Sequence, residues 1–228
     1  MNGGLKRLAD GLLELVYPLR AECMGCGTRA GFPRPWLCED CRQRLAERWV
    51  GALPPEGPFD GAAYAYRYGG PAGGMVRSLK YRGVARLSTV MGRAMVKALE
   101  GIQPIGADGV VSVPMHKKRL AERGIDHAGL LARAVAGQLA LPVLDGALER
   151  TRNTPQQARL EPAQRRRNMD GAIALRGDVA GRRILLVDDV RTTGATANAC
   201  ATALREGGAS AVYLLCFAIA GEKDDDRQ

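Results

Sequence analysis

The segment from Arg182 to Arg205 constrains the fold more than any other part of the chain. It opens with the branched apolar run Ile184–Val187, which is typical of a strand buried on both faces of a parallel sheet. Two acids, Asp188 and Asp189, follow where this strand is expected to emerge, and an Ala-rich stretch with helical spacing comes after them. We therefore expect an α/β domain with a doubly wound, mostly parallel sheet and helices on both faces.

The turn between the acids and this helix has the composition of a phosphate-binding loop. It comprises Thr192, Thr193, Gly194, Ala195 and Thr196. Backbone N–H groups at a helix N-terminus and threonine hydroxyls donate hydrogen bonds to an anion, and glycine lets the backbone approach it closely. The carboxylates suit hydroxyl groups or a magnesium ion. A sugar phosphate meets both demands, whereas the alternative is an ordinary buried strand followed by a capped helix.

The sequence ILLVDDVRTTGAT resembles the signature of the type I phosphoribosyltransferases, which bind 5-phosphoribosyl-1-pyrophosphate (PRPP). The resemblance implies that Asp188 and Asp189 bind the two ribose hydroxyls, and we expect both side chains to face a solvent-filled cleft. It also implies that Mg²⁺ accompanies the diphosphate. In that family the loop after an earlier strand binds the pyrophosphate, which assigns this role to Met115, His116, Lys117 and Arg119.

Further patterns along the chain fit the same architecture. Strands are expected at 63–68, 109–114, 143–149 and 211–220, and helices at about 42–50, 73–82, 87–99 and 126–140. Ligands of such sheets bind beyond the carboxyl ends of the strands. We expect the phosphoribosyltransferase-like domain to span residues 59–220, after a punctuated linker and before a polar tail at 221–228.

Two basic segments are each open to two interpretations. The cluster Lys80–Gly83 either faces the ligand or lies on a solvated surface. The Arg-rich stretch between Glu149 and Ile173 lacks apolar periodicity, which alone indicates a solvated loop. Type I phosphoribosyltransferases, however, have a mobile loop here that closes over the diphosphate and excludes water. The resemblance therefore implies a flexible closing loop that includes Arg150, Arg152, Gln156, Arg165 and Arg167.

Four cysteines near the N-terminus form two CxxC pairs, Cys23 with Cys26 and Cys38 with Cys41. Four thiolates at this spacing can surround a tetrahedral ion, so we predict a structural zinc site with no position open for catalysis. A disulfide is disfavoured because nothing in the sequence indicates export to an oxidising compartment. A redox CxxC would require a thioredoxin-like context, which the surrounding sequence lacks.

The rest of the N-terminal segment indicates where the protein resides. Residues 5–19 place leucines at helical intervals, so an amphipathic helix is expected there. Asp10 and Glu14 interrupt it, and the sequence shows no membrane span or signal peptide, which predicts a cytoplasmic protein. Residues 1–58 would then hold this helix, the zinc motif and the linker. The net charge of +9 favours polyphosphates or nucleic acid as partners.

The order of the motifs narrows the family. PMHKKRLAERG, RTRNTPQQ, RRRNMDGA and LLVDDVRTTGAT follow a four-cysteine motif, and this set resembles the ComF family of competence-associated, phosphoribosyltransferase-like proteins. The resemblance covers about residues 12–220. Members commonly read RGFNQ where this chain has Arg123 to His127. The histidine either alters a ligand contact or, as we expect, lies on the surface.

Two functions follow from this resemblance. The first is transfer of a phosphoribosyl group from PRPP to a nitrogen acceptor, for which no acceptor-binding segment is visible in the sequence. The second is a non-catalytic DNA-uptake factor that binds single-stranded DNA or a nucleotide, with competence proteins as further partners. The oligomeric state is not indicated by the sequence.

The predicted closing loop can be tested by limited proteolysis. Trypsin should cut the free protein at one or more of Arg159, Arg165, Arg166 and Arg167. Saturating PRPP with Mg²⁺ should slow this cutting, because loop closure shields the sites. The measurement is the rate at which the intact chain disappears with and without ligand. An unchanged rate would mean that the segment is a solvated connector or serves nucleic acid.

Overall fold

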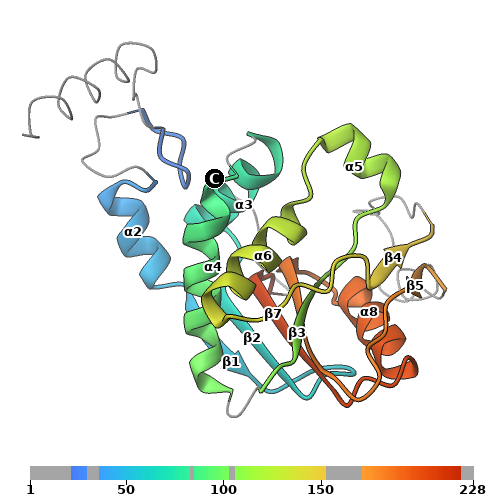
Figure 1. The fold of residues 1–228 in the computed structure, drawn as a ribbon. Helices are drawn as coiled ribbons and strands as arrows, with labels where there is room; N and C mark the ends of the chain where they lie inside the picture. Colours follow the sequence, from blue (N-terminus) through green and yellow to red (C-terminus); the bar gives the residue numbers. More distant parts are fainter. Residues whose placement is uncertain (1–21, 30–35, 83–84, 103–105, 153–170, 222–228) are drawn as a thin grey trace, which may run out of the picture.

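A five-stranded sheet forms the centre of the computed structural model, which describes residues 22–29, 36–82, 85–102, 106–152 and 171–221 (Figure 1). The strands lie in the order β1 (Trp49–Leu53), β2 (Gly61–Arg67), β7 (Ala211–Ile219), β6 (Arg183–Arg191) and β3 (Gly109–Ser112). Strand β1 is antiparallel to β2, and the other three pairings are parallel. The mostly parallel sheet predicted from the sequence is confirmed.

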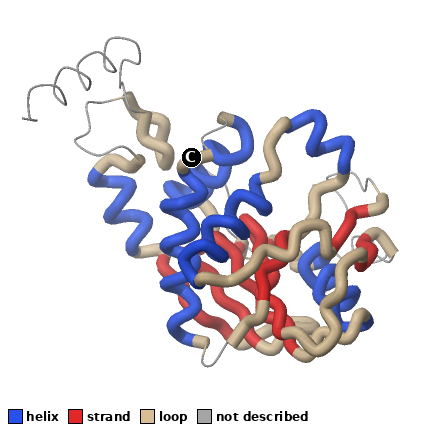
Figure 2. The backbone as a smooth tube through the Cα atoms, in the orientation of Figure 1, coloured by secondary structure: helices blue, strands red, loops and turns tan. Residues whose placement is uncertain are grey.

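Apolar residues on both faces of this sheet form two separate clusters. Strand β6 shows the alternation: Leu185 and Val187 belong to one cluster, and Ile184 and Leu186 to the other. The first cluster is covered by α3 (Gly70–Tyr81), α4 (Leu87–Ala98) and α6 (His127–Leu139), and the second by α8 (Ala195–Glu206) (Figure 2). Helices on both faces confirm the doubly wound fold.

Smaller elements surround this centre. They are α2 (Glu39–Ala46), the 3-10 helix η1 (Leu99–Gly101), α5 (Lys117–Arg123), and the strands β4 (Leu148–Arg150) and β5 (Ile173–Leu175). Strands β4 and β5 pair antiparallel and form a second, two-stranded sheet. Helix α2 contacts α3, so the cysteine segment adjoins the helices on one face of the main sheet.

Two predictions about individual elements are wrong. The strand expected at 143–149 is interrupted, because the chain turns at Asp145–Gly146, where Gly146 has a φ of 72°. Only Val143 bridges to β3, and the following residues enter the small sheet instead. The helix expected at 42–50 ends at Ala46, and part of the expected linker is strand β1. The ring of Trp49 packs edge-on against Tyr66 of β2, with 5.5 Å between the ring centroids, which favours the strand.

Several predictions fall on residues outside the described ranges. These are the helix at 5–19, the loop residues Gln156, Arg165 and Arg167, and the polar tail after residue 221. The division of the chain at residue 58 stays a prediction, and β1 on its N-terminal side pairs within the main sheet. Across the described part of the chain, no helix has the length and apolar character needed to cross a membrane.

Candidate functional site

Asp188 and Asp189 lie within the last part of β6 rather than after it. The strand continues to Arg191 because it still pairs with β7, where Asp188 lies opposite Cys216. Its ladder with β3, in contrast, ends at Val187. The two acids therefore lie beyond the end of one neighbouring strand, at the carboxyl edge where ligands of doubly wound sheets bind.

The two carboxylates point to opposite faces of the sheet, as strand geometry requires of successive residues. The Oδ2 atom of Asp189 faces α3 and α6, at 2.7 Å from Nζ of Lys80 and 3.3 Å from Nε2 of His127. The contact with Lys80 is an ion pair by distance, although it lacks the angles of a hydrogen bond. Asp189 is only 4% exposed, so the prediction that both acids face a solvent-filled cleft is wrong for this residue.

Asp188 is half-buried, and its Oδ1 accepts a hydrogen bond of 2.8 Å from the backbone N–H of Asp189. Burial and the negative charge of Asp189 raise the pKa of Asp188 to about 7, against the opposing charges of Lys80 and Arg150. The pKa of Lys80 is also raised: burial alone would lower it, but the charge of Asp189 outweighs that effect. The two adjacent acids therefore differ: an ion pair fixes the carboxylate of Asp189, whereas the raised pKa of Asp188 lies near neutral pH.

Lys80 and His127 are the site residues that sequence reasoning did not assign. The ammonium of Lys80 pairs with Asp189, so this residue of the basic cluster does not lie on a solvated surface, whereas Tyr81 and Arg82 are exposed. The expectation that His127 lies on the surface is wrong, because the residue is 6% exposed and its ring contacts Asp189. Burial lowers the pKa of His127, and the Asp189 carboxylate opposes this shift.

The predicted turn leads directly into α8. Gly194 is the N-cap residue with a φ of 73°, in the left-handed region that favours glycine, and no side chain caps the helix. Thr192 and Thr193 are exposed, and Ala195 and Thr196 are half-buried. The strand, turn and helix therefore follow each other as predicted, and the first N–H groups of α8 have no side-chain cap.

Arg191 is a further residue beneath this turn that the sequence pattern did not reveal. It is 8% exposed, and its guanidinium donates hydrogen bonds to the hydroxyl of Tyr64 at 2.6 Å and to the carbonyl of Glu56 at 2.9 Å. A Cβ atom added at Gly194 would lie 2.9 Å from Nε of Arg191. The turn therefore rests on a buried positive charge and has no room for a side chain at Gly194.

The residues predicted to bind pyrophosphate follow β3 at the same edge of the sheet. Met115 and Arg119 are half-buried, and Lys117 begins helix α5. His116 is the N-cap of that helix, and its Nδ1 accepts a hydrogen bond from the backbone N–H of Lys118. The ammonium of Lys117 lies 2.8 Å from Oε1 of Glu149, so this cation is paired with a residue of the small sheet.

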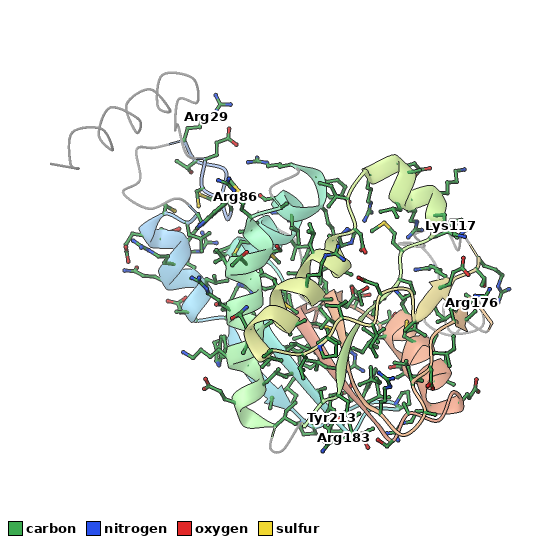
Figure 3. All side chains as sticks on the ribbon, viewed as in Figure 1. Arg29, Arg86, Lys117, Arg176, Arg183 and Tyr213 are labelled. Atoms are coloured by element: carbon green, nitrogen blue, oxygen red, sulfur yellow. The ribbon has the colours of Figure 1, made fainter. Side chains whose placement is uncertain are left out.

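Glu149 joins two cations at the small sheet. Its Oε2 atom lies 2.9 Å from Nε of Arg176, while its other oxygen contacts Lys117. Figure 3 shows Lys117 and Arg176 approaching each other from α5 and from the end of β5. Of the two predicted closing-loop residues within the described ranges, Arg150 is half-buried and Arg152 is exposed.

The four cysteines come together as predicted. Their sulfur atoms all lie within 4.8 Å of one another, and Sγ of Cys26 is 3.9 Å from Sγ of Cys38. Zinc–sulfur bonds of about 2.3 Å in a tetrahedron place sulfur atoms about 3.8 Å apart, so the set fits zinc. Hydrogen bonds with Thr28 lower the pKa of Cys26 to about 6, which favours the thiolate. Burial raises the pKa of Cys41, and a bound cation would offset this.

Zinc content should depend on these cysteines alone. Purified protein should hold one zinc per chain, and Cys38→Ser should lose it. The backbone N–H of Cys41 donates to Sγ of Cys38, the N-cap of α2, and serine also caps helices well, so this variant removes the ligand while keeping a cap. The N-terminal segment should unfold while the main sheet persists. Elemental analysis measures the zinc content, and circular dichroism measures the folding. The control is Cys200→Ala, which changes a core residue of α8 and should keep the zinc. Zinc-free wild-type protein, prepared without chelators, would contradict it.

The raised pKa of Asp188 predicts a pH-dependent stability. The folded protein holds a proton that the unfolded chain releases near pH 4, so this group's contribution is lost as the pH rises from about 4 to about 7. Asp188→Asn cannot titrate, so its unfolding free energy relative to wild type should rise between pH 5 and pH 8. Urea denaturation at several pH values measures the difference, with the exposed Asp145→Asn as control. Parallel curves for Asp188→Asn and wild type would show that the acid is ionised throughout.

Comparisons with known proteins agree with this description. A family described as the phosphoribosyl transferase domain matches residues 120–228. The DNA utilization protein YhgH of Escherichia coli K12 is 29% identical over 202 residues, which cover 86% of this chain and 82% of that protein. Competence protein F of Haemophilus influenzae is 26% identical over 200 residues, which cover 84% of this chain and 87% of that protein.

A solved structure gives a weaker likeness. The purine phosphoribosyltransferase from Pyrococcus horikoshii Ot3 is 15% identical, covers 59% of this chain and 82% of its own, and has a TM-score of 0.37. A score of this size supports no conclusion about function. The resemblance to the ComF family of phosphoribosyltransferase-like proteins is confirmed: a relative named Competence protein F matches over most of the chain, residues 120–228 match the phosphoribosyl transferase domain, and the four cysteines form a cluster.

Proposed function

We propose that the chain binds PRPP at the carboxyl edge of its sheet and transfers the phosphoribosyl group to a nitrogen acceptor. The observation that carries this proposal is the course of β6 through Asp188 and Asp189 into the left-handed Gly194 and the N-terminus of α8. One short segment thereby presents acceptors for hydroxyl groups and donors for a phosphate. The phosphoribosyl transferase match over residues 120–228 includes this segment and supports the assignment.

The turn at Thr192–Thr196 would bind the 5-phosphate. The first N–H groups of α8 and the hydroxyls of the exposed Thr192 and Thr193 are its donors. The buried guanidinium of Arg191 adds positive charge behind the turn, where it is shielded from water and therefore acts more strongly on an anion. A phosphate at this position would meet backbone donors in front and a fixed cation behind.

The two acids would bind the ribose hydroxyls. The half-buried Asp188 would accept one hydroxyl, and a hydroxyl donor favours its ionised form. Asp189 would accept the other with the oxygen that does not face Lys80. In this arrangement Lys80 and His127 hold the Asp189 carboxylate in one orientation, so they position the ribose without touching it.

The diphosphate would lie near Met115, His116, Lys117 and Arg119, as the family resemblance implies. In the transfer, the bond between ribose C1 and the pyrophosphate oxygen breaks and the electron pair leaves with pyrophosphate. The lone pair of the acceptor nitrogen forms the new bond to C1, and that nitrogen then loses a proton. Mg²⁺, whose preferred oxygen ligands the diphosphate supplies, would stabilise the charge of the leaving group. The cations of the loop would act on the same charge.

A second function is favoured by a different observation. The relatives carry the names DNA utilization protein and Competence protein F, and this chain has a net charge of +9. These facts support a role in DNA uptake in which the protein binds single-stranded DNA or a nucleotide without catalysis. Binding of PRPP separates the first proposal from binding of single-stranded DNA, because only the first requires PRPP to contact the two acids and the turn.

Calorimetric titration with PRPP and Mg²⁺ tests the first proposal. The double variant Asp188→Asn/Asp189→Asn should bind PRPP at least about tenfold more weakly, because a hydrogen bond to a charged group contributes about 1.5–3 kcal/mol. Binding of inorganic phosphate should change much less, since phosphate does not use the acids. Asp188→Asn alone should also weaken binding, and it leaves the ion pair of Asp189 intact.

The matched control is Asp178→Asn, an exposed acid in the loop before β6, which should bind PRPP as wild type does. Equal affinity of wild type and the double variant, with both folded, would remove the acids from the ligand site. If such proteins still bound single-stranded DNA, the role in DNA uptake would be the better account.

A further inference from the structure

Helix α3 lies between the four-cysteine knuckle (residues 22–29 and 36–41) and the candidate ligand site. Figure 1 shows the knuckle beside α3, on the side away from β3 and α5. The same helix carries Lys80, which pairs with Asp189. The four-cysteine knuckle and the candidate ligand site therefore both contact α3, a helix of 12 residues.

The contacts with the knuckle follow one side of α3. A Cβ atom added at Gly74 would lie 1.8 Å from the carbonyl oxygen of Gly25, so the two backbones touch and only glycine fits. The hydroxyl of Ser78 donates a 3.2 Å hydrogen bond to the carbonyl of Met24. Arg82, at the C-cap of the helix, forms a 2.6 Å ion pair with Glu22. Positions 74, 78 and 82 are four residues apart, so they share one face of the helix.

Lys80 lies on a different side of the same helix turn. It follows Ser78 by two residues, which places it about 200° around the helix axis from the knuckle contacts. Its side chain is 20% exposed and its Nζ lies 2.7 Å from Oδ2 of Asp189, whose side chain is 5% exposed. A shift of α3 against the knuckle therefore moves the cation that faces the buried carboxylate.

The third side of α3 packs into the core through Met75, Val76 and Leu79. This core packing also holds the helix in place. The knuckle therefore affects the position of α3 only through contacts that add to the core packing. A pocket of about 320 Å³ lies along the seam, lined by Cys26 and Arg77 among others. The contacts at Gly74, Ser78 and Arg82 join the knuckle to the helix beside this pocket, so they add to the core packing that holds α3.

We propose that the four-cysteine knuckle positions Lys80 through α3, so that metal binding in the knuckle and ligand binding at Asp189 are coupled. The ligand half of this inference rests on the proposed PRPP site. Zinc, which the cysteine set fits, would fix the loop that carries Gly25 and Met24. Lys80 is then a positioning residue, because it acts on ligand through Asp189.

Substitutions in the seam test the coupling. Gly74→Ala should displace the knuckle and weaken PRPP binding by about tenfold or more. Its matched control is Gly137→Ala in α6, where an added Cβ meets nothing within 4 Å and affinity should change by less than about twofold. Wild-type PRPP affinity in Gly74→Ala, together with reduced zinc content, would overturn the coupling.

A milder pair of variants covers the case in which Gly74→Ala does not fold. Ser78→Ala loses only its hydrogen bond to Met24 and should weaken PRPP binding by about threefold or more. Ser88→Ala, in the first turn of α4, loses a comparable hydrogen bond to the carbonyl of Ala85 and should have no such effect. Equal effects of the two serine substitutions would show that the loss is one of general stability.

A double-variant cycle separates positioning by Lys80 from a general structural role. Lys80→Met should weaken PRPP binding and retain zinc. Adding Ser78→Ala to Lys80→Met should then cause little further loss, because the residue through which the seam acts is already gone. Losses that multiply in the double variant would mean that the knuckle and Lys80 act independently, and the inference would fail.

An NMR measurement keeps this inference separable from the proposed function. The chain has two histidines, and the ring of His127 contacts the same carboxylate oxygen as Lys80. Its imidazole resonances, assigned with His127→Gln, should shift in the same direction in Ser78→Ala and in Lys80→Met. If wild-type protein does not bind PRPP, the proposed function fails, but the shift of the His127 resonances still tests whether the knuckle positions Lys80. Unchanged His127 resonances in Ser78→Ala would refute this inference.

Discussion

The ion pair between Lys80 and Asp189 is the contact on which the arrangement of the site depends. A carboxylate that is 4% exposed needs a nearby cation, since an unpaired buried charge costs several kcal/mol. Lys80 comes from α3 and Asp189 from β6, so the pair joins segments more than a hundred residues apart in the chain. It ties α3 to β6 beside the core packing of Met75, Val76 and Leu79.

The turn that follows β6 depends on a second buried cation. Arg191 is held by Tyr64 and by the carbonyl of Glu56, and the backbone of Gly194 lies directly on its guanidinium. The turn could not carry a side chain at Gly194 without displacing this arginine. Each half of the segment therefore contacts a cation: Lys80 pairs with Asp189, and Arg191, which also pairs with the exposed carboxylate of Glu56 at 3.4 Å, lies against the turn. This arrangement is the one that the proposed ligand, with hydroxyls at one end and a phosphate at the other, would require.

The parts of the site that follow from local sequence were predicted, and those that depend on packing were not. Apolar alternation, the acids and the glycine turn lie within one continuous stretch, so strand, turn and helix could be placed. Lys80 and His127 come from two other helices, and no local pattern shows that both meet Asp189. Strand alternation does indicate that adjacent acids face opposite ways, and applying it to Asp188 and Asp189 would have corrected the expectation of a shared cleft. Strand β1 was missed because Gly51 and the prolines after it read as a linker, whereas the Trp49–Tyr66 contact that favours pairing is not local.

The different surroundings of the two acids would give them different parts in the proposed binding of ribose. Asp189 has Lys80 at 2.7 Å, so its negative charge is balanced before any ligand arrives. Asp188 accepts a hydrogen bond from the backbone N–H of Asp189, and its raised pKa of about 7 leaves it partly protonated at neutral pH. A hydroxyl that donates to a carboxylate stabilises its ionised form, so the proposed binding of ribose at Asp188 would release a proton near neutral pH. At low pH, Asp188 would have to lose its proton for the ligand to bind, which weakens binding. At high pH, Asp188 is already ionised and this loss of affinity disappears. At the proposed site, ligand affinity would therefore follow the protonation of Asp188, while Lys80 would keep the carboxylate of Asp189 in place.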